Sequence, residues 1–260
     1  MVIVVAVLFF TLSNLGPIVK TMVNTIGPKI AKTEVSVSDV SVSLFSGEAK
    51  ITDFFLGNPE GFTSDQAMRV GSVYCDIDEG SITKNPIVIN KIEVIAPEIT
   101  YEKMEGTDNF RALLENLQSS AKAEKKEADK EKDTGGEARK IVINHVIVKD
   151  GTVNLTMAAL GGKGISAPLP DIHLKDIGKE KEGASPAEAF EEIFASLYES
   201  INADSVTALF NDGLKQAGVL KDRAAEGLKA GGEAAKKVLE SSSKDIESAT
   251  EGLKDLFKKK

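Results

Sequence analysis

The sequence predicts an α+β protein with an N-terminal transmembrane helix, a curved antiparallel β-sheet of repeated strand-turn-strand units, and C-terminal amphipathic helices. Three observations lead to this prediction. No charged residue precedes Lys20, Ile-Val-Ile-Asn occurs twice, and apolar residues recur at helical spacing from Ser185 onward. The 260-residue chain is therefore divided into a transmembrane anchor with a juxtamembrane helix (1–30), a repeat β-sheet domain (33–180) and an amphipathic helical region (185–260).

The anchor prediction rests on the first 19 residues, MVIVVAVLFFTLSNLGPIV, which are uncharged. A helix of that length is roughly 28 Å long, close to the ~30 Å hydrocarbon core of a bilayer. A cleaved signal peptide and a buried core helix are the alternatives, but the run lacks a basic n-region and an A-x-A-like cleavage site. The missing n-region also leaves open whether Met1 is the true start. Lys20, Lys29 and Lys32 follow the run, and the positive-inside rule then favours a cytoplasmic domain.

The repeat is longer than the tetrapeptide. The two copies read IVINKIEVIAPEITYE and IVINHVIVKDGTVNLT, starting at positions 87 and 141. In register, apolar residues match apolar residues, Pro97 falls on Gly151, and Tyr101 falls on Leu155. A unit of this kind cannot bury its apolar face alone. We therefore expect the copies to stack into one long antiparallel sheet.

Other parts of the sheet domain have their own patterns. Apolar and polar residues alternate over 34–45, which predicts a half-buried strand with a break at Ser38-Asp39. Helical spacing of apolar residues over 109–120 predicts a short helix that covers the sheet. Eleven of the twenty residues at 119–138 are charged, and they form no apolar face. A solvated helix extension is one interpretation of this insertion, and disorder is the favoured one. Six residues are expected at structural turns: Gly47, Asn58, Pro59, Gly61, Pro97 and Gly151.

The C-terminal region begins with a capping box at Ser185-Pro186-Ala187-Glu188. Its apolar seam is thin, and the chain ends in Phe-Lys-Lys-Lys. One interpretation is a partner-docking helix of low stability. The other is a helix on a membrane interface, with apolar side chains inserted and lysines near lipid phosphates. The residues at this candidate membrane interface are Leu256, Phe257, Lys258, Lys259 and Lys260.

Several function classes are disfavoured. A formal charge of −8 argues against nucleic acid, which selects basic surfaces. Cys75, the single cysteine, cannot form an internal disulfide and is expected to face the core. His145 and His173 are too few for the usual zinc clusters. No nucleophile–base pair can be assembled, so we expect neither catalysis nor a metal or cofactor. The sequence indicates no oligomeric state.

These elements together resemble the AsmA-like proteins of bacterial envelopes, most strongly over residues 1–118. The residues that carry the resemblance are Gly47, Asn58, Pro59, Gly61, Phe62, Ile89, Ile92, Val94 and Pro97. The resemblance implies a single-pass inner-membrane protein whose curved sheet faces the periplasm. Larger members of that family are linked to moving or organising lipids through an apolar groove.

The leading functional prediction is a non-catalytic envelope protein whose apolar sheet face binds membrane lipids or assists their transfer. Acyl chains laid there gain roughly 0.8 kcal/mol per buried CH₂. The rival is a structural subunit that pairs with a protein partner through its sheet edge and C-terminal helices. In that version, helices over Phe110–Leu117 and Phe190–Leu197 cover the apolar face. The predicted groove residues are Val35, Val37, Val73, Ile77, Ile87, Ile89, Ile141, Ile143, Val153 and Leu155.

Overall fold

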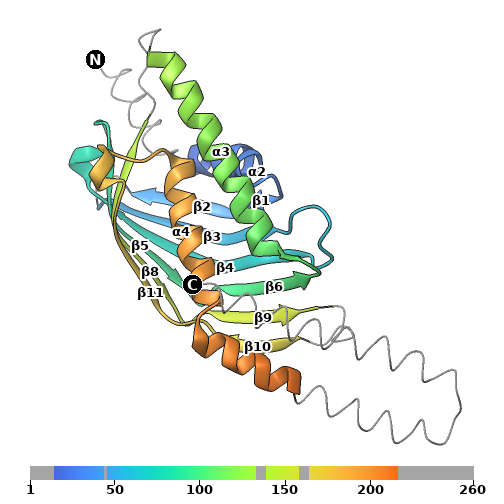
Figure 1. Cartoon of the computed structure of the whole chain (residues 1–260). Helices are drawn as coiled ribbons and strands as arrows, with labels where there is room; N and C mark the ends of the chain where they lie inside the picture. Colours follow the sequence, from blue (N-terminus) through green and yellow to red (C-terminus); the bar gives the residue numbers. More distant parts are fainter. Residues whose placement is uncertain (1–14, 44–45, 133–138, 158–163, 216–260) are drawn as a thin grey trace, which may run out of the picture.

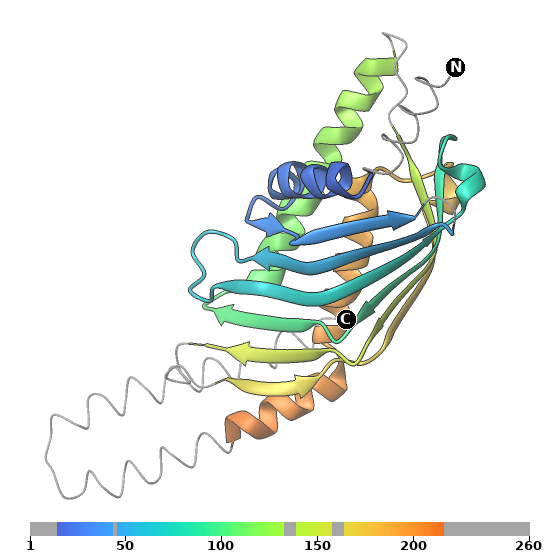
Figure 2. The same ribbon diagram turned by 180° about the vertical axis from the view of Figure 1, so that it is seen from behind.

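The computed structural model describes residues 15–43, 46–132, 139–157 and 164–215, and these have an α+β fold (Figure 1). Their eleven strands form one mixed sheet, with α3 and α4 lying across one of its faces. The view from behind shows the opposite face free of these helices (Figure 2). The structure therefore confirms the predicted α+β class, with a large sheet and several helices.

The strands are β1 (Val35–Ser36), β2 (Asp39–Ser43), β3 (Glu48–Gly57), β4 (Gln66–Ile77), β5 (Ile87–Ile95), β6 (Glu98–Met104), β7 (Thr107–Asp108), β8 (Ile141–Lys149), β9 (Thr152–Thr156), β10 (Ile165–Pro168) and β11 (Ile172–Ile177). The helices are α2 (Leu15–Ala31), α3 (Asn109–Lys132) and α4 (Pro186–Ile201), with short 3-10 turns η1 (Glu79–Ser81) and η3 (Lys179–Lys181). Residues 204–215 are also helical. The predicted break at Ser38-Asp39 separates β1 from β2.

The two repeat copies lie side by side in the middle of the sheet. β5 pairs with β8, and β6 pairs with β9, so that Ile87 is opposite Ile141 and Tyr101 is opposite Leu155. Partners are 54 positions apart throughout, the same offset as that between the two copies in the sequence. The expected antiparallel arrangement is wrong for this pair, because both ladders are parallel. The chain returns through α3 between the copies, and a helical crossover of this kind joins parallel strands.

Both copies bend at the same position. Ala96 and Asp150 have left-handed φ values of 50° and 56°, and Pro97 and Gly151 follow them. A Cβ on Gly151 would lie 2.9 Å from Leu169 Cδ2 and 3.0 Å from Pro97 Cγ, so the bend is closely packed at this position. The Thr152 amide donates to the Pro97 carbonyl oxygen at 2.9 Å, which continues the ladder across the bend. The matched Pro and Gly therefore lie next to each other where the sheet bends.

Helix α2 includes the end of the predicted anchor, and residues 1–14 lie outside the described part of the chain. The helix lies along the edge strands β1 and β2. A Cβ on Gly16 would be 2.0 Å from the Val40 carbonyl oxygen, so the backbones are in direct contact. The Asn24 side chain accepts from the Val37 amide at 2.8 Å and donates to the Val37 carbonyl at 3.4 Å. No helix among the described residues is long and apolar enough to cross a membrane.

Helix α3 corrects the prediction for the charged insertion. Residues 119–132 continue the helix instead of being disordered, whereas residues 133–138 are outside the described part. The apolar half of α3 packs on the sheet, with Phe110, Leu113 and Leu117 at most 1% exposed. Once that half is formed, Glu and Lys extend the helix at little cost because both are good helix formers.

Helix α4 begins at the predicted capping box. The Ser185 hydroxyl accepts from the Glu188 amide at 3.2 Å, and the Ser185 amide donates to the Glu188 carboxylate at 2.9 Å. Phe194, Leu197 and Ile201 are buried against the sheet and α3. Residues 216–260 of the predicted C-terminal region, including Leu256, Phe257 and Lys258 to Lys260, lie outside the described residues.

Candidate functional site

The apolar face of the sheet is filled by the helices of the chain itself. Phe110 of α3 stacks on Phe194 of α4, with ring centroids 5.0 Å apart and an interplanar angle of 7°. Tyr101 of β6 packs edge-on against Phe110 at 6.3 Å. All three side chains are at most 1% exposed. The centre of the face, where the sequence predicts an acyl-chain groove, is therefore a closed protein core.

The predicted groove residues separate into two groups. Val35, Val37, Ile143, Val153 and Leu155 are buried in the core, which corrects their assignment to an open groove. The other five are half-buried: Val73, Ile77, Ile87, Ile89 and Ile141. Alternation along a strand identifies which residues share a face, but it does not show what covers that face. The covering helices follow from long-range packing.

Cys75 alternates with Val73 and Ile77 on β4 and is partly buried. Burial raises the pKa of its thiol to about 11, because a thiolate is poorly solvated there. An open hollow of about 650 Å³ lies beside it, and its other lining residues are mostly polar, among them Ser41, Glu48 and Lys91. This hollow does not offer a continuous apolar surface to an acyl chain.

A buried polar network holds the Asn-Pro-Glu-Gly-Phe turn. The Glu102 carboxylate accepts from the Thr63 amide at 2.9 Å, the Thr63 hydroxyl at 2.7 Å and the Ser64 amide at 2.7 Å. Asn109 donates from its side chain to the Asn58 side-chain oxygen at 2.7 Å and to the Thr100 carbonyl at 2.7 Å. Asn109, at the start of α3, thus links the turn at Asn58 to β6.

The other predicted turn residues lie nearby or at other strand ends. Pro59 is buried in the same turn, and Gly61 has a φ of 98°. Gly47, between β2 and β3, has a φ of 65°. Left-handed φ values favour glycine because it has no Cβ. These positions have a structural role in shaping the sheet.

The Glu102 network makes stability depend on pH. Desolvation tends to raise the pKa of Glu102, but the hydrogen bonds from Thr63 and Ser64 prevail and lower it. A lowered folded-state pKa stabilises the fold above the unfolded value of about 4.3, and this contribution is lost as the pH falls through the folded pKa. Glu102→Gln is expected to lower the free energy of unfolding by about 1–3 kcal/mol at pH 7. The reason is that the NH₂ group of the new amide would face backbone N–H donors.

Urea unfolding at several pH values measures this effect. Wild-type stability is expected to fall more steeply below about pH 4 than that of Glu102→Gln. Glu98→Gln, at an exposed position on the same strand, is the matched control and is expected to follow the wild type. Parallel curves for wild type and Glu102→Gln contradict the role given to this carboxylate.

A second polar cluster surrounds Asp108 at the N-terminus of α3. One Asp108 oxygen accepts from the Arg111 amide at 2.8 Å, and the other accepts from the Tyr198 hydroxyl at 2.8 Å. Desolvation, followed by the Asp108 charge, raises the pKa of Tyr198 and of Tyr101. Desolvation lowers the pKa of Lys103. Perturbed groups of this kind can mark active sites, but here Asp108 caps α3 and ties it to α4.

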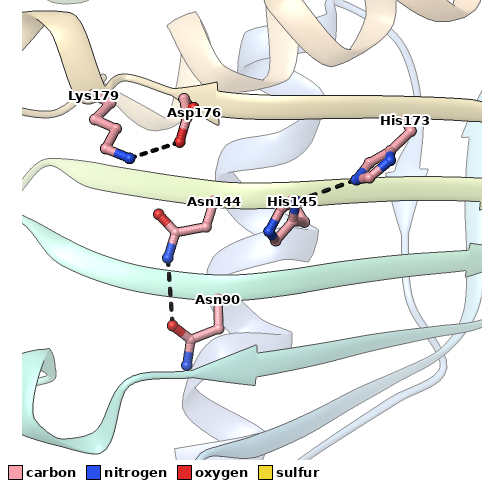
Figure 3. A network of polar contacts seen from close by, with 6 residues as sticks. All are labelled: Asn90, Asn144, His145, His173, Asp176 and Lys179. Atoms are coloured by element: carbon pink, nitrogen blue, oxygen red, sulfur yellow. Dashed lines mark hydrogen bonds and ion pairs between the residues drawn. The ribbon is translucent and has the colours of Figure 1, made fainter.

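A group of polar side chains lies on the outer face of the sheet over β5, β8 and β11 (Figure 3). Asn90 and Asn144, the matched Asn residues of the repeat, are joined by a side-chain hydrogen bond of 3.5 Å. His145 Nδ1 and His173 Nε2 are 3.2 Å apart. Lys149 pairs with Glu93 at 3.3 Å. Both histidines are exposed, and the sequence pattern does not show that they meet.

No family model, curated protein or solved structure matches the chain.

Proposed function

We propose that this protein is a non-catalytic interaction protein of the bacterial envelope, held at the inner membrane by its N-terminal part, with α2 resting on the lipid surface. The supporting observation is an exposed apolar stripe on α2. Ile18, Met22 and Ile26 are 48%, 53% and 41% exposed. They are spaced by four residues and so lie on one side of the helix. They are three of the seven exposed large hydrophobic side chains among the described residues.

The charge of α2 favours a lipid surface as the occupant of this stripe. The helix contains no acidic residue and two lysines, although the whole chain has a formal charge of −8. Lys29 is exposed, whereas the Lys20 ammonium group donates to the Ser38 carbonyl oxygen. Lysines near an anionic membrane contribute about 1 kcal/mol each. The 14 residues that precede the helix are apolar or uncharged, which is consistent with lipid contact continuing along the chain.

The end of α2 is hydrogen-bonded to the rest of the fold. The Asn116 side chain donates to the Ala31 carbonyl at 3.1 Å, and the Ser120 hydroxyl donates to the Ile30 carbonyl at 2.8 Å. These bonds join the end of α2 to α3. A lipid contact through α2 would therefore set the orientation of the whole sheet, and a protein partner would meet its outer face or the C-terminal helices.

Pairing through the sheet edge has less support than the sequence suggests. The edge strand β10 ends in Pro168, and the edge strand β11 contains Lys175 and Asp176, the latter with a φ of 59°. Proline, lysine and local distortion are the usual features that protect an edge from pairing with another chain.

The resemblance to AsmA-like proteins supports a periplasmic location for the sheet, while the lysines after the apolar run favour the opposite side.

Tryptophan fluorescence tests the lipid contact, because the chain contains no Trp. Met22→Trp in the full chain places the only indole on the exposed stripe. In vesicles of equal parts phosphatidylcholine and phosphatidylglycerol, we expect blue-shifted emission and quenching by brominated acyl chains. Leu209→Trp, at a position that is 46% exposed outside α2, is the control and is expected to keep water-like emission. Identical spectra for the two variants contradict the proposal.

A second candidate is lipid binding at the less covered end of the sheet. There Ile77 and Ile87 are half-buried and belong to neither of the two buried hydrophobic clusters, whereas Ile89 packs against the smaller one. The partly accessible apolar surface at this end is therefore that of Ile77 and Ile87. Lipid extraction and mass spectrometry of the purified full chain test this candidate. Recovery of lipid at the level of a matched single-helix anchor contradicts it and leaves the surface contact of α2 unaffected.

A further inference from the structure

The two histidines of the chain are brought together by the fold. His145 on β8 and His173 on β11 are 28 positions apart, and the sequence contains no others. Their strands are antiparallel neighbours, with His173 paired to Ile147 and His145 paired to Lys175. The ring centroids are 5.3 Å apart with an interplanar angle of 42°. Both rings lie on the outer face of the sheet (Figure 3) and are exposed to solvent.

The separation of the two facing nitrogens suits a shared metal ion. His145 Nδ1 and His173 Nε2 are 3.2 Å apart. Two imidazole nitrogens bound to one tetrahedral zinc, each about 2.0–2.1 Å from the metal, are roughly 3.4 Å apart. The distance between the two nitrogens therefore needs to change by only a few tenths of an ångström, and rotation of the exposed rings would direct both lone pairs at one ion. A hydrogen bond between the rings is the metal-free alternative and involves the same two atoms.

The surroundings limit what else can bind the ion. No group of three potential ligands occurs among the described residues, so water would complete the coordination. Asp176 lies near His145 and pairs with Lys179 at 2.9 Å, and its charge offsets part of that of the neighbouring Lys175. Coordination positions occupied by water are typical of a site that exchanges its ion with solvent.

We propose that His145 and His173 form a surface site for a divalent transition metal that prefers imidazole, such as zinc, nickel or copper. Binding requires both facing nitrogens to present lone pairs. In the neutral pair one of these nitrogens carries the shared proton, and that ring must move the proton to its outer nitrogen. Copper is expected to bind more tightly than zinc.

Zinc titration of the full chain, prepared without a polyhistidine tag, tests the site. Nitrogen-15 spectra of the two imidazoles report binding directly, and calorimetry gives the affinity. We expect one zinc ion per chain and perturbation of both imidazoles. His145→Gln and His173→Gln are each expected to weaken zinc binding more than tenfold. Asn144→Ala, which keeps both histidines and changes a neighbouring side chain, is the control and is expected to bind as the wild type does.

Two results would overturn the proposal. One is a wild-type chain whose imidazole signals do not change with zinc. The other is a single histidine variant that keeps the wild-type affinity, which would place the ion on carboxylates elsewhere. Neither result depends on lipid contact through α2, because the histidines lie on a different part of the molecule. Circular dichroism of the variants confirms that exposed substitutions leave the fold intact.

Discussion

Replacing Phe194 with alanine is expected to lower the free energy of unfolding by about 3–5 kcal/mol. The ring is 1% exposed and stacks on Phe110 at a centroid distance of 5.0 Å. Its removal leaves a cavity between α3, α4 and the sheet, because the backbone of three packed elements cannot close around the missing ring. Urea unfolding of the full chain in mild detergent, followed by far-ultraviolet circular dichroism, measures the change.

Leu209→Ala provides the control for Phe194→Ala. This side chain also lies on a helix of the C-terminal region but is 46% exposed, so its truncation is expected to change stability by no more than about 0.5 kcal/mol. Equal effects of the two substitutions would mean that α4 does not close the apolar face. The groove predicted from the sequence would then become the better description.

Gly16→Ala is expected to destabilise the fold by about 1–3 kcal/mol, a range typical of overpacked contacts. A Cβ at this position would lie 2.0 Å from the Val40 carbonyl oxygen, and a backbone atom cannot rotate away as a side chain can. Helix α2 must therefore shift off β2, which also strains the bonds between Asn24 and Val37. The same unfolding experiment measures the loss.

Gly71→Ala is the matched control for the change at Gly16. A Cβ at Gly71 would meet nothing within 4 Å, so the substitution is expected to be neutral or slightly stabilising, since alanine restricts the unfolded chain. If Gly16→Ala is equally harmless, α2 does not lie against β2 in solution. Residues 1–30 would then fit the continuous membrane anchor that their composition suggests.

The repeat offset of 54 positions can be read from the sequence, and the paired residues of the two copies have the same offset in the sheet. Tyr101 and Leu155, which match in the sequence, are ladder partners, and the Pro97 carbonyl oxygen accepts from the amide of Thr152, the residue after the matched Gly151. The capping box at Ser185 is also predicted correctly, since it depends only on residues three positions apart.

Other features could not be derived from local patterns. The direction of the repeat ladders depends on α3, whose charged half has no apolar face to indicate a helix. The closure of the apolar face depends on Phe110 meeting Phe194, residues that are 84 positions apart. The contact between His145 and His173 requires the register of β8 and β11, and neither strand encodes its partner locally. In each case, tertiary packing decides between alternatives that the sequence leaves open.

The constant separation of partners in the repeat ladders has a consequence for how the chain folds. From Ile87 with Ile141 to Glu102 with Thr156, every pair is 54 positions apart. The first of these pairs to form must close a loop of that length, and the later pairs add little further loop entropy. Early formation of α3 would shorten the flexible part of the loop that separates the two copies. Assembly of the central ladder is therefore expected to limit the folding rate, because non-local parallel pairing is slow.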